Sequence, residues 1–284
     1  MTGTVNDGVS ALITILRESA SPDPAREARL LLAHAMGVAP DRITLLAQDS
    51  LPAATLIAAR KLAARRAAGA PISHIIGRRA FYGRDFHVDA RVLDPRPETE
   101  CLIAEALRTP FATFLDLGTG SGAIAITLAA ERPEATGVAT DLSDQALDVA
   151  RQNANALGVA ARLHLVKSDW FAAVTGRFDL IVSNPPYIAA DEMASLQPQV
   201  RLFEPRMALT DDGDGLTAYR IIAAAAPGHL HSDGQLIVEI GPTQGASVAK
   251  MMRDSGFMRV QVVPDLDHRD RVVVGRMPGA AALT

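Results

Sequence analysis

From about Thr113 onward, short apolar runs alternate with longer amphipathic segments, and this alternation restricts the fold more than any other feature of the sequence. The runs with the length and composition of strands are residues 114–117, 136–140, 163–166, 178–183, 235–239, 260–263 and 272–274. The segments with helical spacing are residues 123–130, 144–157, 217–226 and 244–254. Strands that are joined by helical crossovers form a mostly parallel sheet with helices on both faces. The sequence therefore predicts an α/β fold.

The first 70 residues have a different pattern, in which helical segments are separated by proline and glycine. Asp23 and Pro24 can begin one helix, the first by capping free N–H groups and the second by filling the first turn, and Gly37 can end it. Other helices are expected over residues 9–16, from residue 41, and over residues 50–69. Apolar and aromatic runs in residues 71–93 predict a hairpin-like connector. We therefore expect a helical domain at 1–70, a hairpin linker at 71–93 and the α/β domain at 94–284.

Composition limits the class of protein. With 48% hydrophobic and 21% charged residues, the 284-residue chain can bury a substantial core, which excludes disordered and collagen-like proteins. A net charge of −4 argues against a general nucleic-acid binder. Cys101 is the only cysteine, so an intramolecular disulfide and a multi-cysteine zinc site are excluded. Residues 1–10 lack signal-peptide features, and no uncharged apolar stretch reaches about 18 residues, so we expect a soluble, cytoplasmic protein with no membrane partner.

The charge is unevenly distributed along the chain. Between Ser50 and Arg84 there is no acidic residue, whereas seven residues are basic. These are Arg60, Lys61, Arg65, Arg66, Arg78, Arg79 and Arg84. The stretch has two interpretations, a solvated helix face or a docking surface for an acidic partner.

A glycine-rich segment, Asp116-Leu-Gly-Thr-Gly-Ser-Gly122, follows one strand and opens a helix. The glycines let the backbone turn tightly and approach a ligand, and the helix N-terminus offers N–H groups to an anion. Asp141 ends the next strand, where its carboxylate can accept both hydroxyls of a ribose. The pattern fits NAD or S-adenosylmethionine, and the alternative is that the glycines only form a turn and Asp141 caps a helix.

The segment Asn184-Pro-Pro-Tyr187, which directly follows strand 178–183, decides which chemistry is expected. Its two prolines fix the backbone and remove two N–H donors, which leaves the carbonyls of Asn184 and Pro185 and the Asn184 side-chain oxygen as acceptors. Tyr187 adds a flat face on which an amide or a base can stack. The segment predicts a pocket for an NH2 group, with a plain strand-ending turn as the alternative.

Together the two motifs resemble the class I S-adenosylmethionine-dependent methyltransferases that act on exocyclic or amide nitrogen. Three further segments narrow the resemblance to the release factor glutamine methyltransferases (the HemK or PrmC family): Pro95–Glu100, Ser168–Phe171 and Arg201–Pro205. The resemblance covers residues 27–276. Leu93-Asp94 stands where the family usually has an apolar pair, and residues 267–270 stand where a glycine is common, so only local loop geometry departs from the family pattern.

The resemblance implies a Rossmann-like, mostly parallel seven-stranded sheet with a small helical N-terminal domain that binds the substrate. It also implies a reaction, methyl transfer to the side-chain amide nitrogen (N5) of the glutamine in the Gly-Gly-Gln motif of class 1 peptide chain release factors. No direct nucleic-acid partner is expected.

Roles for individual residues follow from the same resemblance. The residues that would contact S-adenosylmethionine are Gly118, Thr119, Gly120, Ser121, Gly122, Asp141, Asp169, Trp170 and Asn184. The residues that would hold the target glutamine are Asn184, Pro185, Pro186 and Tyr187, and of these Asn184, Pro185 and Tyr187 are the candidate catalytic residues. The Pro95–Glu100 segment would close over the cofactor side of the pocket.

These residue types suit methylation of an amide. An amide nitrogen is a poor nucleophile, so acceptors that hold its two N–H bonds would aim it at the methyl group and stabilise the developing positive charge. Positioning then supplies most of the catalysis, and we expect no essential general base and no metal. The alternatives are a methyltransferase for ribosomal protein glutamine or DNA adenine, and a non-catalytic nucleotide-binding module; an NAD-dependent dehydrogenase is disfavoured because no acid is placed near a nicotinamide.

Overall fold

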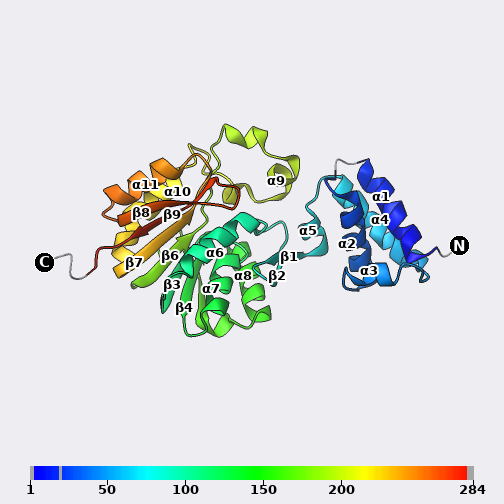
Figure 1. Cartoon of the computed structure of the whole chain (residues 1–284), viewed down its shortest axis with the longest axis horizontal. Helices are drawn as coiled ribbons and strands as arrows, with labels where there is room; N and C mark the ends of the chain where they lie inside the picture. The colour runs from blue at the N-terminus through cyan, green and yellow to red at the C-terminus, as the bar shows by residue number, and fades with distance from the viewer. Residues whose placement is uncertain (1–2, 19–20, 280–284) are drawn as a thin grey trace. The chain divides into compact units, whose positions relative to one another are not determined.

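The computed structural model describes residues 3–18 and 21–279. The chain divides into two compact units (Figure 1). The first comprises residues 1–78 with residues 197–203, and the second comprises residues 79–196 with residues 204–284. A short segment that follows the Asn184–Tyr187 motif in sequence therefore belongs to the first unit.

The first unit is helical. Its helices are α1 (Val5–Arg17), α2 (Pro24–Met36), α3 (Arg42–Leu45), α4 (Ala53–Ala67), α5 (Ile72–Ile76) and α9 (Pro198–Phe203). Asp23 caps α2 by accepting a hydrogen bond from the Arg26 backbone N–H at 3.0 Å, and Gly37 ends that helix, as the sequence predicts. Phe203 at the end of α9 packs against the core of this unit. The prediction of helices in residues 1–70 is confirmed, whereas α5 and α9 were not expected.

A buried ion pair connects α2 and α4 within this unit. Arg66 Nε lies 2.9 Å from Glu27 Oε2, and Arg66 Nη2 lies 3.0 Å from Glu27 Oε1. The two side chains are almost completely buried. Arg66 is therefore a structural residue, whereas Arg60, Lys61 and Arg65 are exposed on α4.

A two-stranded sheet of β1 (Arg78–Phe81) and β2 (Arg84–His87) follows the first unit, with all but Arg78 in the second unit, and it confirms the predicted hairpin. Two basic side chains of this sheet, Arg79 and Arg84, bind other groups of the same unit. Arg84 Nη2 lies 2.6 Å from Glu131 Oε1, and Arg79 Nε donates to the Pro95 carbonyl at 3.0 Å. The basic stretch is thus not one continuous solvent-facing surface.

A seven-stranded sheet forms the centre of the second unit (Figure 1). Its strands are β3 (Thr113–Leu117), β4 (Thr136–Asp141), β5 (Leu163–Lys167), β6 (Phe178–Ser183), β7 (Leu230–Glu239), β8 (Met258–Pro264) and β9 (Asp270–Arg276). They lie in the order β5-β4-β3-β6-β7-β9-β8, and the pairs β7–β9 and β9–β8 are antiparallel while the other pairs are parallel. The predicted mostly parallel, Rossmann-like sheet is confirmed.

Helices cover both faces of this sheet. They are α6 (Glu100–Ala106), α7 (Ala123–Glu131), α8 (Asp144–Ala156), α10 (Thr217–Ala225) and α11 (Gly245–Asp254). Short 3-10 helices lie at Pro97–Thr99, Ala160–Arg162, Glu192–Ser195, Arg206–Ala208 and Ala226–His229. Successive strand residues alternate between the two cores: Leu180 packs with α6 and α7, and Ile181 packs with α10 and α11. Each face of the sheet therefore has its own buried core.

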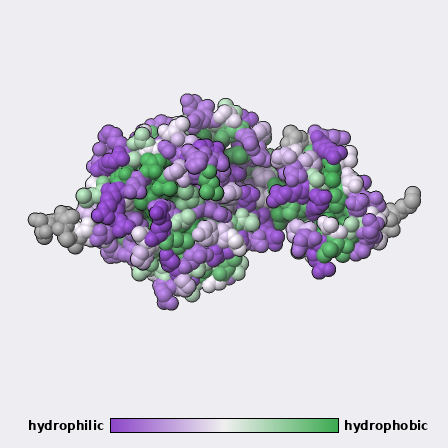
Figure 2. Space-filling view, viewed as in Figure 1, coloured by the Kyte–Doolittle hydropathy of each residue, from purple (hydrophilic) through white to green (hydrophobic). Residues whose placement is uncertain are grey.

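The surface of the second unit is mixed in character. Figure 2 shows hydrophilic residues over most of its visible face, with hydrophobic residues in small groups. In the part of the chain that the structure describes, no helix is long and apolar enough to cross a membrane.

Candidate active site

The candidate site lies where the strand order reverses. β3 is flanked by β4 on one side and by β6 on the other, and β7 follows β6. The register pairs Leu117 with both Thr140 and Ser183, and Ser183 with Val238, so the carboxyl ends of these four strands lie at one edge. Such a reversal opens a crevice at which open α/β sheets bind ligands.

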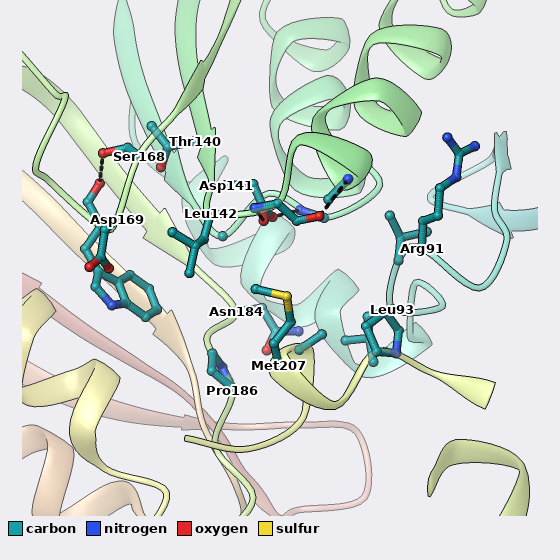
Figure 3. Close-up of a pocket in the computed structure, with 18 residues that line it drawn as sticks. Arg91, Leu93, Thr140, Asp141, Leu142, Ser168, Asp169, Asn184, Pro186 and Met207 are labelled. Atoms are coloured by element: carbon teal, nitrogen blue, oxygen red, sulfur yellow. Dashed lines mark hydrogen bonds between the residues drawn. The ribbon is translucent and has the colours of Figure 1, made fainter. Parts of the chain in front are cut away.

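An open cavity of about 800 Å³ occupies this edge (Figure 3). Its lining includes Gly118, Gly120, Asp141, Leu142, Asp169, Trp170, Asn184, Pro186 and Met207. Leu142 and Met207 are large apolar side chains that remain 52% and 50% exposed. The cavity thus combines apolar walls with a few polar groups.

The glycine-rich loop forms one wall. Gly118 and Gly120 have φ of +71° and +55°, and a Cβ added at either would meet no atom within 4 Å. Thr119 and Ser121 are buried, and both line an adjoining cavity with Gly120. Gly122 lines neither cavity in the described residues; a Cβ there would lie 2.7 Å from the Ile126 side chain. The first two glycines thus leave room for a ligand, and the third allows close packing of α7.

Asp141 at the end of β4 is held against this loop. Its Oδ2 accepts from the Gly120 backbone N–H and its Oδ1 from the Ser143 backbone N–H, both at 2.9 Å. Burial raises the pKa of the Asp141 carboxyl, and the backbone hydrogen bonds oppose that shift. Ser143, rather than Asp141, caps α8. Asp141 is therefore placed at the cavity and retains lone pairs for a ligand.

Asp169 lies across the cavity from Leu93 (Figure 3), and Trp170, the next residue in sequence, also lines the cavity. Asp169 is exposed, and Trp170 is partly buried and packs against the core between the sheet and α10. Trp170 has a φ of +47°, and Ser168 Oγ donates to its carbonyl at 2.8 Å. The turn holds the indole between core and cavity.

Asn184 stands at the junction of the two cavities and lines both. Its Nδ2 donates to Thr99 Oγ1 at 3.2 Å. Pro186 lines the larger cavity, whereas Pro185 is buried and, with Tyr187, is absent from both linings in the described residues. The Asn184–Tyr187 motif therefore divides into two cavity residues and two residues packed behind them.

The backbone of Tyr187 is fixed by a hydrogen bond from Gln244. Gln244 Nε2 donates to the Tyr187 carbonyl at 2.9 Å, while Gln244 Oε1 accepts from the Gly241 backbone N–H at 3.0 Å. Burial raises the pKa of the Tyr187 phenol to about 12, so the ring is neutral at physiological pH.

The Pro95–Glu100 segment borders the second cavity, which has a volume of about 400 Å³ and adjoins the first at Gly118, Gly120 and Asn184. Arg96 of this segment forms an ion pair with the buried Glu204, with Nη2 2.6 Å from Oε1. Burial raises the pKa of the Glu204 carboxyl, and the charge of Arg96 opposes that shift. The segment is thus tied to the loop that follows the Asn184–Tyr187 motif.

Sequence reasoning missed the buried Glu239, which is the last residue of β7 and lies beside the site. The sequence did contain a signal for it, since an acidic residue at the end of an apolar strand run is unusual. Sequence reasoning also missed the part of Gln244 in holding Tyr187, for which no local pattern gave a signal.

Comparisons with known proteins agree with the geometry. A family model described as "Methyltransferase small domain" matches residues 97–215, and one described as "PrmC N-terminal domain" matches residues 10–77. The release factor glutamine methyltransferase of Cereibacter sphaeroides is 56% identical over 96% of this chain and 99% of its own length. The chain belongs to the release factor glutamine methyltransferase family. The enzymes of that name from Xylella fastidiosa Temecula1 and Burkholderia pseudomallei are 46% and 44% identical, over 89% and 92% of this chain and 93% and 94% of theirs.

Solved structures have the same fold. A methyltransferase from Pyrococcus furiosus aligns with a TM-score of 0.54 and 18% identity, covering 76% of this chain and 97% of its own. A T. thermophilus 16S rRNA N2 G1207 methyltransferase in complex with AdoMet and guanosine aligns with a TM-score of 0.51 and 19% identity, covering 70% of this chain and 49% of its own.

As a member of the release factor glutamine methyltransferase family, the chain is a methyltransferase with S-adenosylmethionine as its cofactor. The residues present fit that cofactor. Gly118 and Gly120 leave open space where any side chain would project, and the Asp141 carboxylate and the Trp170 indole face the same cavity.

Proposed function

We propose that this chain transfers a methyl group from S-adenosylmethionine to the side-chain amide nitrogen N5 of the glutamine in the Gly-Gly-Gln motif of class 1 peptide chain release factors. The observation that carries the proposal is the position of Asn184. It lies where the two cavities meet, and its Nδ2 is engaged by Thr99. Oδ1 is then the atom available to accept an N–H of a substrate amide. The printed names of the relatives support a release factor as substrate.

The cofactor contacts in this proposal follow the lining of the two cavities. Gly118 to Ser121 would line the methionine end, Asp141 would accept from the ribose hydroxyls, and Asp169 and Trp170 would flank the adenine; the contact expected of Gly122 is not supported, because Gly122 lines neither cavity in the described residues. The exposed apolar side chains of Leu142 and Met207 line the same cavity and offer apolar contact to a ligand there.

In the proposed reaction, S-adenosylmethionine supplies a methyl group bonded to a positively charged sulfur. Asn184 Oδ1 would accept from an N–H of the target amide and stabilise the positive charge that develops on the nitrogen. The contacts expected from the Pro185 carbonyl and the Tyr187 ring are not supported by the cavity linings, since both residues lie behind Asn184 and Pro186; they would instead fix the backbone of the motif. Correct alignment can contribute roughly 7–11 kcal/mol to lowering the barrier, and the proton is then lost to water.

The helical domain, residues 1–70, would bind the release factor. Arg60, Lys61 and Arg65 are exposed on α4 and would face an acidic surface of the partner. Arg66 is excluded from this role because it is buried against Glu27.

The proposal is tested by offering isotope-labelled S-adenosylmethionine with one of three substrates: a class 1 release factor, ribosomal protein, or adenine-containing DNA. We expect label in the release factor alone, and no label in a release factor whose motif glutamine is replaced by alanine. Label in DNA or ribosomal protein, with none in the release factor, would replace the proposed substrate.

A further inference from the structure

Glu239 is a buried carboxyl group that the mechanism above does not use. It ends β7, is 1% exposed, and its Oε2 has no hydrogen-bond partner in the described residues. The backbone does not need this side chain, because Glu239 pairs with Val272 of β9 and its carbonyl accepts from the Tyr219 hydroxyl at 2.8 Å. A buried carboxyl group is costly, so its presence beside the site calls for a reason other than strand pairing.

Thr99 and Asn184 are polar side chains that affect the ionisation of this carboxyl group. Burial raises the pKa of Glu239 to about 7, and the side chains of Thr99 and Asn184 oppose the shift by favouring the ionised form. Thr99 is itself buried, and its Oγ1 accepts from Asn184 Nδ2 at 3.2 Å. The positive charge of Arg271 also favours the ionised form, but its guanidinium hydrogen-bonds elsewhere, to Asp265 and to the Ile240 carbonyl. The two uncharged side chains that favour the ionised form of Glu239, Thr99 and Asn184, therefore both belong to the candidate active site.

The direction of these hydrogen bonds matters because a carboxamide has two different ends. Above its pKa of about 7, Glu239 is a carboxylate that can only accept, so a hydroxyl beside it points its hydrogen at the carboxylate and offers its lone pairs to other donors. Thr99 then accepts the N–H of Asn184, and Asn184 Oδ1 is turned to the cleft. With no acceptor at residue 239, the Thr99 hydroxyl could donate to Asn184 Oδ1 instead, and the amide would present N–H groups to a substrate that itself offers N–H groups.

We propose that Glu239, acting through Thr99, is a positioning residue that fixes which end of the Asn184 carboxamide faces the methyl-transfer cleft. This inference rests on the proposed function, since it concerns how Asn184 receives a substrate NH2 group. It adds two residues, Thr99 and Glu239, to the machinery of the site, neither of which touches the reacting atoms.

The test compares isosteric variants of the two positioning residues. Thr99→Val removes both the donor and the acceptor, Glu239→Gln removes the obligatory acceptor, and Thr99→Ser retains the hydroxyl. Thr127→Val is the matched control, because Thr127 is also fully buried in the same unit and its Oγ1 has no partner in the described residues.

We expect Thr99→Val and Glu239→Gln to lower kcat by about tenfold or more, with KM for the release factor and Kd for S-adenosylmethionine within about threefold of wild type. Thr99→Ser should stay within about threefold of wild-type kcat, and Thr127→Val should match wild type. Wild-type kcat in Thr99→Val or in Glu239→Gln, or equal losses in Thr99→Ser and Thr99→Val, would overturn the inference.

A second readout does not depend on the substrate. In a protein labelled with 15N at asparagine, the Asn184 side-chain N–H signals are identified by their loss in Asn184→Asp, and we expect slow hydrogen exchange in wild type and fast exchange in Thr99→Val. Unchanged exchange would overturn the positioning role. If exchange changes as expected while wild type methylates no release factor, the proposed function fails and the positioning of Asn184 stands.

Discussion

Arg96 contacts both oxygens of the Glu204 carboxylate, with Nη2 2.6 Å from Oε1 and 2.8 Å from Oε2. The carboxylate side chain is 2% exposed and the arginine side chain 34% exposed. The contact joins the Pro95–Glu100 segment to the loop that follows the Asn184–Tyr187 motif. It thereby holds together two segments that border the candidate site.

Replacing Arg96 with alanine would leave the Glu204 carboxylate buried and unpaired. We expect Arg96→Ala to lower the free energy of unfolding by about 2 kcal/mol, which is below the cost for a fully buried pair because the arginine is one-third exposed. Lys250→Ala, which breaks an exposed pair with Asp254 on α11, is the control and should cost less than about 1 kcal/mol. Urea unfolding measures both. Equal losses of unfolding free energy in the two variants would show that the Arg96–Glu204 pair stabilises the protein no more than an exposed ion pair does.

Asn184→Ala should separate catalysis from cofactor binding. We expect kcat to fall by at least about a hundredfold, because the acceptor for the target amide is lost, and Kd for S-adenosylmethionine to change by less than about tenfold. Turnover assays and calorimetry measure the two quantities. Comparable losses in both would contradict the division between substrate and cofactor contacts.

Gly120→Ala should weaken cofactor binding. The added methyl group would project into the cavity that Gly120 lines, and we expect Kd for S-adenosylmethionine to rise by about tenfold or more. Gly158→Ala is a matched control, since Gly158 also has a positive φ, +74°, with open space around its Cα but lines no part of either cavity. Both variants should lose about 1–2 kcal/mol of stability from backbone strain. Similar Kd values for the two variants would contradict the cofactor assignment.

Asp116 gives the stability a defined pH dependence. It is fully buried, and burial raises its pKa from 3.8 to about 7. Because the folded pKa lies above the unfolded one, the stabilisation from protonated Asp116 is complete below pH 3.8 and is lost as the pH rises through about 7. Asp116→Asn cannot ionise, so wild type should lose up to about 4 kcal/mol relative to this variant over that window.

Urea unfolding of both proteins from pH 4 to pH 8 measures this difference. The raised pKa of Glu239 affects both proteins equally and cancels in the comparison. Parallel stability curves would show that Asp116 remains ionised in the folded protein throughout.

Charge reversal on α4 tests the release-factor surface. We expect the triple variant Arg60→Glu, Lys61→Glu, Arg65→Glu to raise KM for the release factor by about tenfold or more at low salt with kcat unchanged. Arg253→Glu, an exposed reversal on α11 in the other unit, is the control and should leave KM unchanged. An unchanged KM in the triple variant would remove α4 from the docking surface.

The fold and the cofactor cleft were predictable because their signals are local. The strand before Asp116, the glycines that follow it and the acid at the end of the next strand lie within about 30 residues of sequence, and crossover connections bring their ends to one edge. The spacing of apolar residues was also sufficient to place the strands on a buried sheet.

The partners of the motifs were not predictable, because they come from distant parts of the chain. Asn184 contacts Thr99 across 85 positions, and Arg96 contacts Glu204 across 108. The sequence identified both segments of each pair through their motifs but gave no means of pairing them. The membership of Pro198–Phe203 in the helical unit was missed for the same reason, since only packing of Phe203 against that core reveals it.

The most direct test of the account is tandem mass spectrometry of the Gly-Gly-Gln peptide from a class 1 release factor treated with S-adenosylmethionine and this enzyme. The account predicts one added methyl group, on the glutamine side-chain nitrogen, and none when Asn184→Ala replaces wild type. A methyl group on any other residue, or equal methylation by wild type and Asn184→Ala, would contradict it.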